Sequence, residues 1–189
     1  DEDTDSFRRI IGDLTGHIDC DLPVDAIVHL AAQVVFPQIT ASQFAQGNIL
    51  STLGMFKLAN VLNVGTVVFH SSTSVYGQPE VGVLDEAVVP RGPDAYGVSK
   101  YMCELIARDF ADGMKFVIPR TPGVIGPNAN PNWITGLAER ALTGQALKIF
   151  NSASLFNNTL HVTDYCRFVQ SIFERQLSRD GVDIVNVAS

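Results

Sequence analysis

The sequence is poor in basic residues and in long apolar runs. It holds 13 Lys and Arg against 20 Asp and Glu, so its formal net charge is -7. An acidic surface repels phosphate backbones, which argues against nucleic acid as a partner. No uninterrupted apolar run approaches the roughly 20 residues that a membrane-spanning helix needs. No signal peptide opens the chain, which begins with Asp1, Glu2 and Asp3. We therefore expect no membrane partner.

Cysteine is scarce and gives no disulfide pattern. It occurs at Cys20, Cys103 and Cys166. Three widely spaced cysteines are typical of free thiols in a reducing compartment. The four histidines do not combine with these cysteines into a metal-binding spacing. We therefore expect a cytoplasmic protein that holds no metal.

The remaining composition predicts a chain that folds around a core. Its 189 residues are 46% hydrophobic and 17% charged, which fits one ordinary domain or a large part of a bigger one. Short β-branched runs alternate with longer amphipathic stretches. We expect strands at 26–30, 66–71, 115–120 and 183–187, and helices at 40–62, 93–113, 133–142 and from Thr163 or Asp164. This order predicts an α/β fold, a doubly wound parallel sheet with right-handed crossovers.

Single residues predict further details of these elements. Gly65 is expected to end the first helix in the manner of a C-terminal glycine. Pro119 is expected to lie at the end of its strand, because it has no N–H to donate to a neighbouring strand. Pro93 and Asp94 would begin the second helix. Its buried face would carry four apolar residues, Met102, Leu105, Ile106 and Phe110.

A tyrosine and a lysine are one helical turn apart in the run YGVSK, from Tyr96 to Lys100. Residues i and i+4 share one face of a helix, so the ammonium would lie beside the phenol. An opposite charge favours the ionised form of an acid. The pKa of Tyr96 is therefore expected to fall well below its usual value of about 10. Such a tyrosine can act as acid and base near neutral pH, although the same spacing also occurs by chance on solvated helices.

Hydroxyl side chains follow the second predicted strand, in the run SSTSVYG from Ser71 to Gly77. An open parallel sheet places its ligand crevice beyond the carboxyl ends of its strands. A hydroxyl there can donate a hydrogen bond to a substrate oxygen as charge shifts onto it, although a Ser- and Thr-rich turn is the alternative. At the end of the first predicted strand, Ala31 and Ala32 are small enough for a flat molecule to approach the backbone. Together with the tyrosine and lysine, these features indicate a ligand site.

Several stretches match one protein family in order along essentially the whole chain. They are GDLTG at 12–16, AIVHLAAQV at 26–34, SSTSVYG at 71–77, YGVSK at 96–100, PRTPGVIGP at 119–127, LHVTD at 160–164 and IVNVAS at 184–189. On these motifs the chain resembles the extended short-chain dehydrogenase/reductase superfamily, in particular its NAD(P)-dependent sugar epimerase/dehydratase family. The resemblance implies a partial Rossmann-like NAD(P)-binding domain over residues 1–189, with 123–164 contributing to the substrate side.

The resemblance also implies a reaction and residue roles. Hydride would pass between a substrate carbinol carbon and C4 of the nicotinamide of NAD or NADP. Tyr96 would be the catalytic acid/base, Lys100 would lower its pKa and hold the nicotinamide ribose, and Ser72 would bond the reacting oxygen. Asn48 would support the active-site helix. The implied cofactor contacts are Asp13, Leu14, Leu30, Ala31, Ala32, Asn48, Ser71, Tyr96, Lys100 and Pro122, and the implied substrate contacts are Ser72, Thr73, Ser74, Gly123 and Asn157.

The sequence departs from the family pattern at its two ends and at several positions on the substrate side. It lacks the Gly-rich phosphate-binding unit of roughly 30 residues, so we expect a fold that is incomplete at the N-terminus. We also expect it to lack most of the small substrate lobe. Gly123 stands where the family commonly has asparagine, and Asn157 where nucleotide-sugar enzymes commonly have arginine. These changes favour a smaller sugar, a sugar acid or another hydroxy compound over a nucleotide sugar. Thr73 and Ser74 are neutral where dehydratases carry an acidic pair, which argues against dehydration.

Three functions remain open from the sequence. The first is an NAD(P)-dependent epimerase or dehydrogenase/reductase that acts on a sugar, a nucleotide sugar or a related hydroxy compound. The second is a non-catalytic dinucleotide-binding or sensing protein of the same fold, and the third is a fragment without function. The resemblance further implies a homodimer built on the helices that follow Thr40 and Pro93. NAD and NADP are not distinguished.

Overall fold

The computed structural model describes residues 8–16, 18–36, 38–127, 129, 132–148, 159–175 and 180–188. Its main sheet is parallel and contains β1 (Ala26–His29), β2 (Thr66–Phe69), β3 (Ser71–Ser72), β4 (Lys115–Thr121) and β7 (Gly181–Asn186). β1 pairs with β2. Both β2 and β3 pair with β4, and β7 pairs with β4 as well. A second, two-stranded sheet pairs β5 (Gly123–Ile125) with β6 (Thr159–His161).

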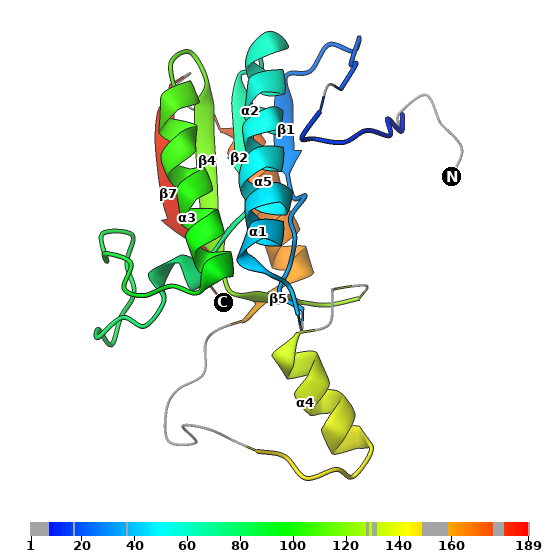
Figure 1. The fold of residues 1–189 in the computed structure, drawn as a ribbon, viewed down its shortest axis with the longest axis vertical. Coiled ribbons are helices and arrows are strands. Elements are labelled where there is room, and N and C mark those ends of the chain that lie inside the picture. The colour runs from blue at the N-terminus through cyan, green and yellow to red at the C-terminus, as the bar shows by residue number, and fades with distance from the viewer. Residues whose placement is uncertain are drawn as a thin grey trace.

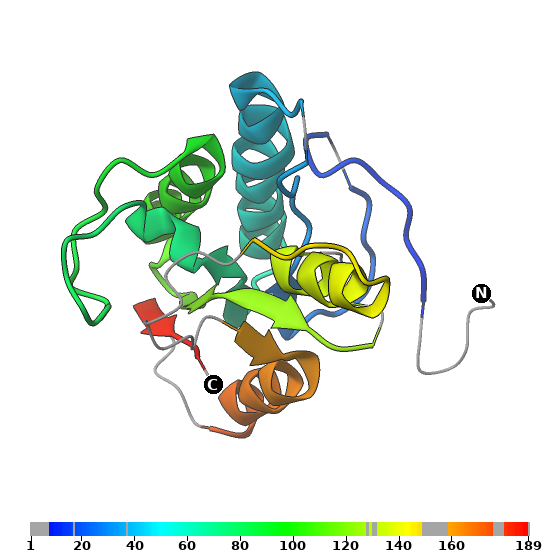
Figure 2. The same ribbon diagram turned by 90° about the horizontal axis from the view of Figure 1, so that it is seen from below.

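Helices cover both faces of the main sheet. On one face lie α1 (Ala41–Phe44), the π-helix η1 (Ala45–Leu50) and α2 (Ser51–Val61), which follow one another without a break, beside α3 (Ala95–Ala107). On the opposite face lies α5 (Val162–Glu174), as the view in Figure 2 shows. Helix α4 (Trp133–Leu142) lies beyond the end of the main sheet, next to β5 (Figure 1). The predicted α/β fold, with a parallel sheet wound on both faces, is confirmed.

The hydrophobic core consists of two layers, one on each side of the sheet. The larger layer packs α2 and α3 against the sheet around Phe56, which is fully buried. The centre of its ring lies 5.8 Å from that of Phe69 and 4.8 Å from that of Phe116. The smaller layer packs Ile172 of α5 against Val68 and Val117. Successive strand residues thus point into opposite layers, and both faces of the strands are buried. This explains why continuous β-branched runs predict buried strands.

Pro119 lies inside β4 and not at its end, which corrects the prediction. The pairings of Val68 with Val117 and of Ser71 with Arg120 place His70 opposite Pro119. Proline has no N–H to donate to a neighbouring strand. The break between β2 and β3 falls at His70, directly opposite this proline. The interruption leaves β3 as a strand of two residues at the carboxyl edge of the sheet.

Two predicted helix ends are also wrong. The helix that begins after Thr40, whose side chain accepts a hydrogen bond from the Gln43 N–H, ends at Val61, with Leu62 as its C-cap. Asn63, with φ +54°, takes the left-handed conformation expected of a C-terminal residue, and Gly65 instead joins the helix to β2. Helix α5 is capped by His161, whose ring accepts from the Thr163 N–H, and not by Thr163 or Asp164.

The buried face of α3 differs from the apolar face expected from the sequence. Met102 is 40% exposed, whereas Lys100, Cys103 and Glu104 are almost completely buried. Leu105, Ile106 and Phe110 are partly buried. The helix therefore turns a mixed polar face toward the carboxyl edge of the sheet. Polar partners at that edge, described below, make this burial possible.

The central position of Phe56 yields a stability prediction. Phe56→Ala is expected to lower the free energy of unfolding by about 3–5 kcal/mol, because it removes a buried ring and leaves a cavity. Val61→Ala, at a position of the same helix that is 79% exposed, is the control and should change it by less than about 0.5 kcal/mol. Urea unfolding measures both values. Equal unfolding midpoints for the two variants would contradict the core described here.

Candidate active site

The predicted site residues gather at the carboxyl edge of the main sheet. Leu30, Ala31 and Ala32 follow β1, the helical turn η2 (Thr73–Tyr76) follows β3, and Pro122 follows β4. Helix α3 begins at the same edge, with the Asp94 carboxylate accepting a hydrogen bond from the Gly97 N–H at 2.8 Å. Three strand ends and one helix start thus border a common region.

The Ser72 hydroxyl lies near the Tyr96 phenol at this edge and lowers its pKa. Ser72 caps η2 and accepts a hydrogen bond from the Ser74 N–H at 3.1 Å. Gly97 permits the close approach of α3 to this turn, because a Cβ there would lie 2.2 Å from the Ser74 carbonyl oxygen. The glycine that follows the tyrosine is therefore a packing requirement of the pair.

Lys100 lies one turn below Tyr96 and is only 2% exposed. Its ammonium donates to the His70 carbonyl oxygen at 2.8 Å and sits 5.0 Å from the centre of the Phe69 ring. Burial lowers the pKa of Lys100 to about 8, against the raising effects of Cys103 and Glu104. A lysine with this pKa is a cation at neutral pH whose charge is held under the strand end.

The pKa of Tyr96 is raised above its ordinary value, so the prediction of an acidified phenol is wrong. Burial is the largest cause; the Ser72 hydrogen bond lowers the pKa and the Asp94 carboxylate raises it. The Phe44 ring packs on the tyrosine at 5.8 Å between centres. Sequence spacing placed Lys100 on the correct face but did not show that its ammonium turns toward the His70 carbonyl.

Two buried histidines flank the lysine. Burial, and then the positive charge of Lys100, lower the pKa of His29 and of His70 to about 4 each. His29 shares a hydrogen bond of 3.0 Å with Thr52, and His70 shares one of 2.8 Å with Tyr165. Both rings are therefore neutral near pH 7, which leaves the nearby positive charge on Lys100.

Asn48 joins three parts of the site. Its amide donates to Ser99 Oγ at 2.8 Å and to the Gln33 carbonyl oxygen at 3.2 Å, and its oxygen accepts from the Gln33 N–H at 2.7 Å. Ser99 in turn donates to the Tyr96 carbonyl oxygen at 2.7 Å. Asn48 lies in the π-helical turn η1, a geometry often found at functional sites. It therefore fixes the segment after β1 against the helix of Tyr96.

A hollow of about 500 Å³ brings together three predicted cofactor contacts, Asp13, Leu14 and Ala31. The Thr15 N–H and hydroxyl each donate to the Asp13 carboxylate at 2.9 Å, and these bonds lower its pKa. The charged carboxylate can accept hydrogen bonds from a ligand, while Ala31 leaves room for a flat group. Gln33 and Gly47 also line the hollow, and the sequence pattern did not single them out.

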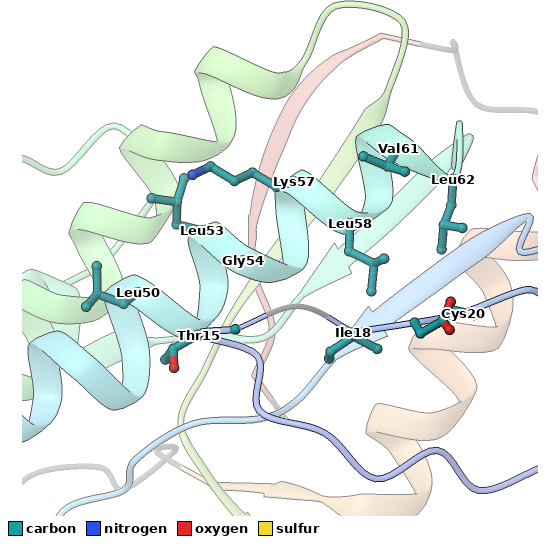
Figure 3. A pocket seen from close by; sticks show the side chains of 12 residues that line it. Thr15, Ile18, Cys20, Leu50, Leu53, Gly54, Lys57, Leu58, Val61 and Leu62 are labelled. Atoms are coloured by element: carbon teal, nitrogen blue, oxygen red, sulfur yellow. The ribbon is translucent and has the colours of Figure 1, made fainter.

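Two glycines of the continuous helix formed by α1, η1 and α2 allow other segments to approach it closely. Gly54 faces the segment that carries Asp13 and Leu14, and Gly47 faces Gln33. A Cβ at Gly54 would lie 1.8 Å from the Leu14 carbonyl oxygen, and one at Gly47 would lie 2.8 Å from Gln33 Cβ. A second hollow, of about 540 Å³, lies between this segment and α2 (Figure 3). It is lined largely by Ile18 and by leucines of η1 and α2, and it contains none of the predicted site residues.

The remaining predicted contacts lie in different places. Thr73 and Ser74 are partly buried in η2, Ser71 is fully buried, and Gly123 opens β5. Asn157 lies outside the described residues. Among the described residues, no group of three or more His, Cys, Asp or Glu could hold a metal ion. No described helix is both long and apolar enough to cross a membrane.

Comparison with known proteins places these features in a family. The model of the NAD dependent epimerase/dehydratase family matches residues 9–188. The chain is 28% identical over 180 residues to a dTDP-glucose 4,6-dehydratase of Streptomyces niveus, covering 90% of this chain and 53% of the relative. It is 35% identical over 126 residues to a UDP-glucose 4-epimerase of Azospirillum brasilense, covering 64% of this chain and 35% of the relative. The chain thus spans about half, or less, of the length of such relatives.

Solved structures share the fold. The chain superposes with a TM-score of 0.81 and 28% identity on MoeE5 in complex with UDP-glucuronic acid and NAD, covering 96% of this chain and 64% of that one. A UDP-glucuronic acid 4-epimerase from Bacillus cereus in complex with NAD gives a TM-score of 0.76 at 23% identity, covering 87% of this chain and 54% of that one. The predicted Rossmann-like fold and the family resemblance are confirmed.

The neutral histidines predict how stability depends on pH. A histidine in an unfolded chain has a pKa near 6.5, so between pH 6.5 and pH 4 the unfolded state binds more protons than the folded one. The free energy of unfolding should therefore fall as the pH is lowered through this range. His29→Gln should reduce the slope by up to one proton, about 1.4 kcal/mol per pH unit. Urea unfolding at several pH values measures this slope, and an unchanged slope would contradict the buried neutral state of His29.

Proposed function

The chain belongs to the NAD dependent epimerase/dehydratase family, and we propose that it oxidises and reduces a carbinol carbon of a nucleotide sugar with NAD as the hydride carrier. The observation that carries this proposal is the placement of Ser72, at the end of β3, and Tyr96, at the start of α3, at the same carboxyl edge of the sheet, with the Lys100 ammonium bonded to the His70 carbonyl oxygen one turn below. This is the place where an open parallel sheet binds its ligand.

The residues present fit the dinucleotide. The hollow beside Asp13 offers a carboxylate for an exocyclic amino group, and Leu14 and Ala31 offer apolar contact for an adenine ring. Ala31 and Ala32 follow β1, between this hollow and the catalytic edge, where the middle of the cofactor would run. Lys100 would hold the nicotinamide ribose, and Pro122 would lie beside the nicotinamide. Bound NAD supplies the acceptor and donor of hydride.

The chain's own residues would handle the proton. The raised pKa of Tyr96 keeps the phenol protonated at neutral pH, so it is ready to donate to a substrate oxygen as a carbonyl is reduced. In the oxidation direction the phenol must first release its proton to solvent, so that the phenolate oxygen can accept the proton of the substrate hydroxyl. The Ser72 hydroxyl favours that direction because its hydrogen bond lowers the pKa of Tyr96. Ser72 would also bond the reacting oxygen, with Thr73 and Ser74 near the substrate.

The relatives favour a nucleotide sugar over the smaller substrates expected from Gly123 and Asn157. Their names include UDP-glucose 4-epimerase and dTDP-glucose 4,6-dehydratase. The neutral side chains of Thr73 and Ser74 offer no carboxyl group for eliminating water, so we propose epimerisation or a simple redox reaction for this chain. Residues 123–164, which include β5, β6 and α4, would contribute to the substrate side of a domain over 1–189.

We also propose that the protein is a homodimer in the cytoplasm. Val98 and Met102 are one turn apart on α3 and are 44% and 40% exposed, so they form an apolar face that a second copy could cover. The three cysteines are unpaired, and Cys103 is buried. Free thiols suit a reducing compartment.

The role of Tyr96 can be tested by removing one oxygen atom. Tyr96→Phe in the full-length protein is expected to lower kcat by about 10²–10⁴-fold, because it deletes the proton donor and acceptor. NAD binding, measured by calorimetry, should persist. Tyr101→Phe on the same helix is the matched control and should retain full turnover. UDP-glucose and UDP-glucuronic acid serve as test substrates.

Two results would count against the proposal. Unchanged turnover in Tyr96→Phe would remove the acid/base role from this residue. NAD binding by the wild-type protein with no turnover of any nucleotide sugar would instead favour a dinucleotide-binding or sensing protein.

The dimer can be tested by placing a charge in the proposed interface. Met102→Lys is expected to yield monomers in sedimentation equilibrium, because a buried ammonium would face apolar side chains. Leu142→Lys on α4, where the side chain is 88% exposed, is the control and should leave the dimer intact. A monomeric wild-type protein, or a dimeric Met102→Lys variant, would contradict this arrangement.

A further inference from the structure

A buried ion pair lies beneath the candidate active site. The Glu104 carboxylate accepts hydrogen bonds from Arg120 Nε at 3.1 Å and from Arg120 Nη2 at 2.7 Å, and both side chains are at most 3% exposed. Glu104 follows Lys100 by one turn and Tyr96 by two turns, so the three residues share one face of α3. Because a guanidinium grips a carboxylate in a fixed fork geometry, Arg120 of β4 fixes the place of this carboxylate.

The same carboxylate holds the strand residue that precedes Ser72. Ser71 Oγ donates to Glu104 Oε1 at 2.5 Å, and Ser71 is fully buried. From the other side, Thr121 Oγ1 donates to the Ser71 carbonyl oxygen at 3.3 Å. Two side-chain contacts thus fix a single residue of β3.

Strand β3 depends on these contacts more than a longer strand would. It consists of two residues and is separated from β2 by His70, opposite Pro119. So short a strand has few main-chain hydrogen bonds with which to fix its own position. The bond from Ser71 to Glu104 therefore links β3, which carries Ser72, directly to α3, which carries Tyr96.

We propose that Glu104 and Ser71 are positioning residues for the reaction. The Glu104 carboxylate, fixed by Arg120, holds the Ser71 hydroxyl so that the neighbouring Ser72 hydroxyl meets the Tyr96 phenol. Glu104 and Ser71 act through Ser72 and Tyr96 and not on the substrate. The kinetic part of this inference rests on the function proposed above, whereas the contact between Ser72 and Tyr96 can be measured without turnover.

The direct test is Ser71→Ala in the full-length protein. This change removes the link to β3 and leaves the Glu104–Arg120 pair intact. The readout is NMR of the protein labelled with ¹³C at tyrosine Cζ, which reports on the phenol oxygen of each tyrosine, including the four within residues 1–189. Tyr96→Phe assigns the Tyr96 signal. We expect Ser71→Ala to shift this signal and to raise the pKa of Tyr96, because the Ser72 bond that lowers it is weakened.

The matched control is Ser171→Ala on α5, a serine whose hydroxyl donates to the Phe168 carbonyl oxygen at 2.7 Å. It removes the same atom from a partly buried serine and should leave the Tyr96 signal in place. With NAD and UDP-glucose, Ser71→Ala should lower kcat by about 10- to 100-fold, as expected for misplacement of a catalytic group. The KM for UDP-glucose should stay within about twofold, since ground-state binding is unchanged. The control should keep wild-type kcat.

An unchanged Tyr96 signal and pKa in Ser71→Ala would overturn the proposal. Loss of kcat with an unchanged Tyr96 signal would also overturn it, because Ser71 would then act elsewhere. If the wild-type protein turns over no nucleotide sugar, the function proposed above fails while the NMR result still decides the positioning role. If Ser71→Ala does not fold, Ser71→Cys provides the same readout with a weaker donor of similar size.

Discussion

A polar face of helix α3, buried against the carboxyl edge of the sheet, is the constraint on which the rest of the structure depends. From the helix start inward it carries Tyr96, Lys100 and Glu104, and each finds a polar partner at the strand ends. Burying such groups without partners is costly, and breaking a buried ion pair costs about 3–5 kcal/mol. The observed placement of α3 gives the phenol, the ammonium and the carboxylate a polar partner each. The contacts that hold α3 on the sheet are therefore also the contacts that assemble the candidate site.

The electrostatic character of the edge follows from that burial. Lys100 has its pKa lowered to about 8, yet it stays charged near pH 7. Burial, and then the charge of Lys100, lower the pKa of His29 and of His70 to about 4, so both rings are neutral near pH 7. Burial raises the pKa of Tyr96, and Ser72 is the contact that opposes this effect. The chemistry of the phenol is set by local burial and by one hydroxyl, more than by the lysine one turn away.

Periodic patterns predicted the fold well where burial alone decides the structure. The β-branched runs became β1, β2 and β4, and the order of elements fixed the α/β class. Predictions failed where a single contact decides. Gly65 did not end its helix, because Asn63 takes the left-handed position. Pro119 sits inside β4, because its neighbour strand is interrupted at His70. Met102 is exposed, because polar partners at the strand ends attract the other face of α3.

The sequence predicted which residues belong to the candidate site, but not which partners their side chains contact. The motifs located Ser72, Tyr96, Lys100 and Ala31 at one edge of the sheet, but the partners of Lys100 and the close approach at Gly54 depend on chain segments far apart in sequence. Glu104 lies four residues before Arg108 on α3, yet it pairs with Arg120 of β4 in the core.

The most direct test of the account is a crystal structure of the full-length protein with NAD. We expect the adenine in the hollow beside Asp13, the nicotinamide next to Tyr96 and Ser72, and the Lys100 ammonium within hydrogen-bond distance of the nicotinamide ribose. A dinucleotide bound elsewhere, or a nicotinamide that contacts neither Tyr96 nor Lys100, would contradict it.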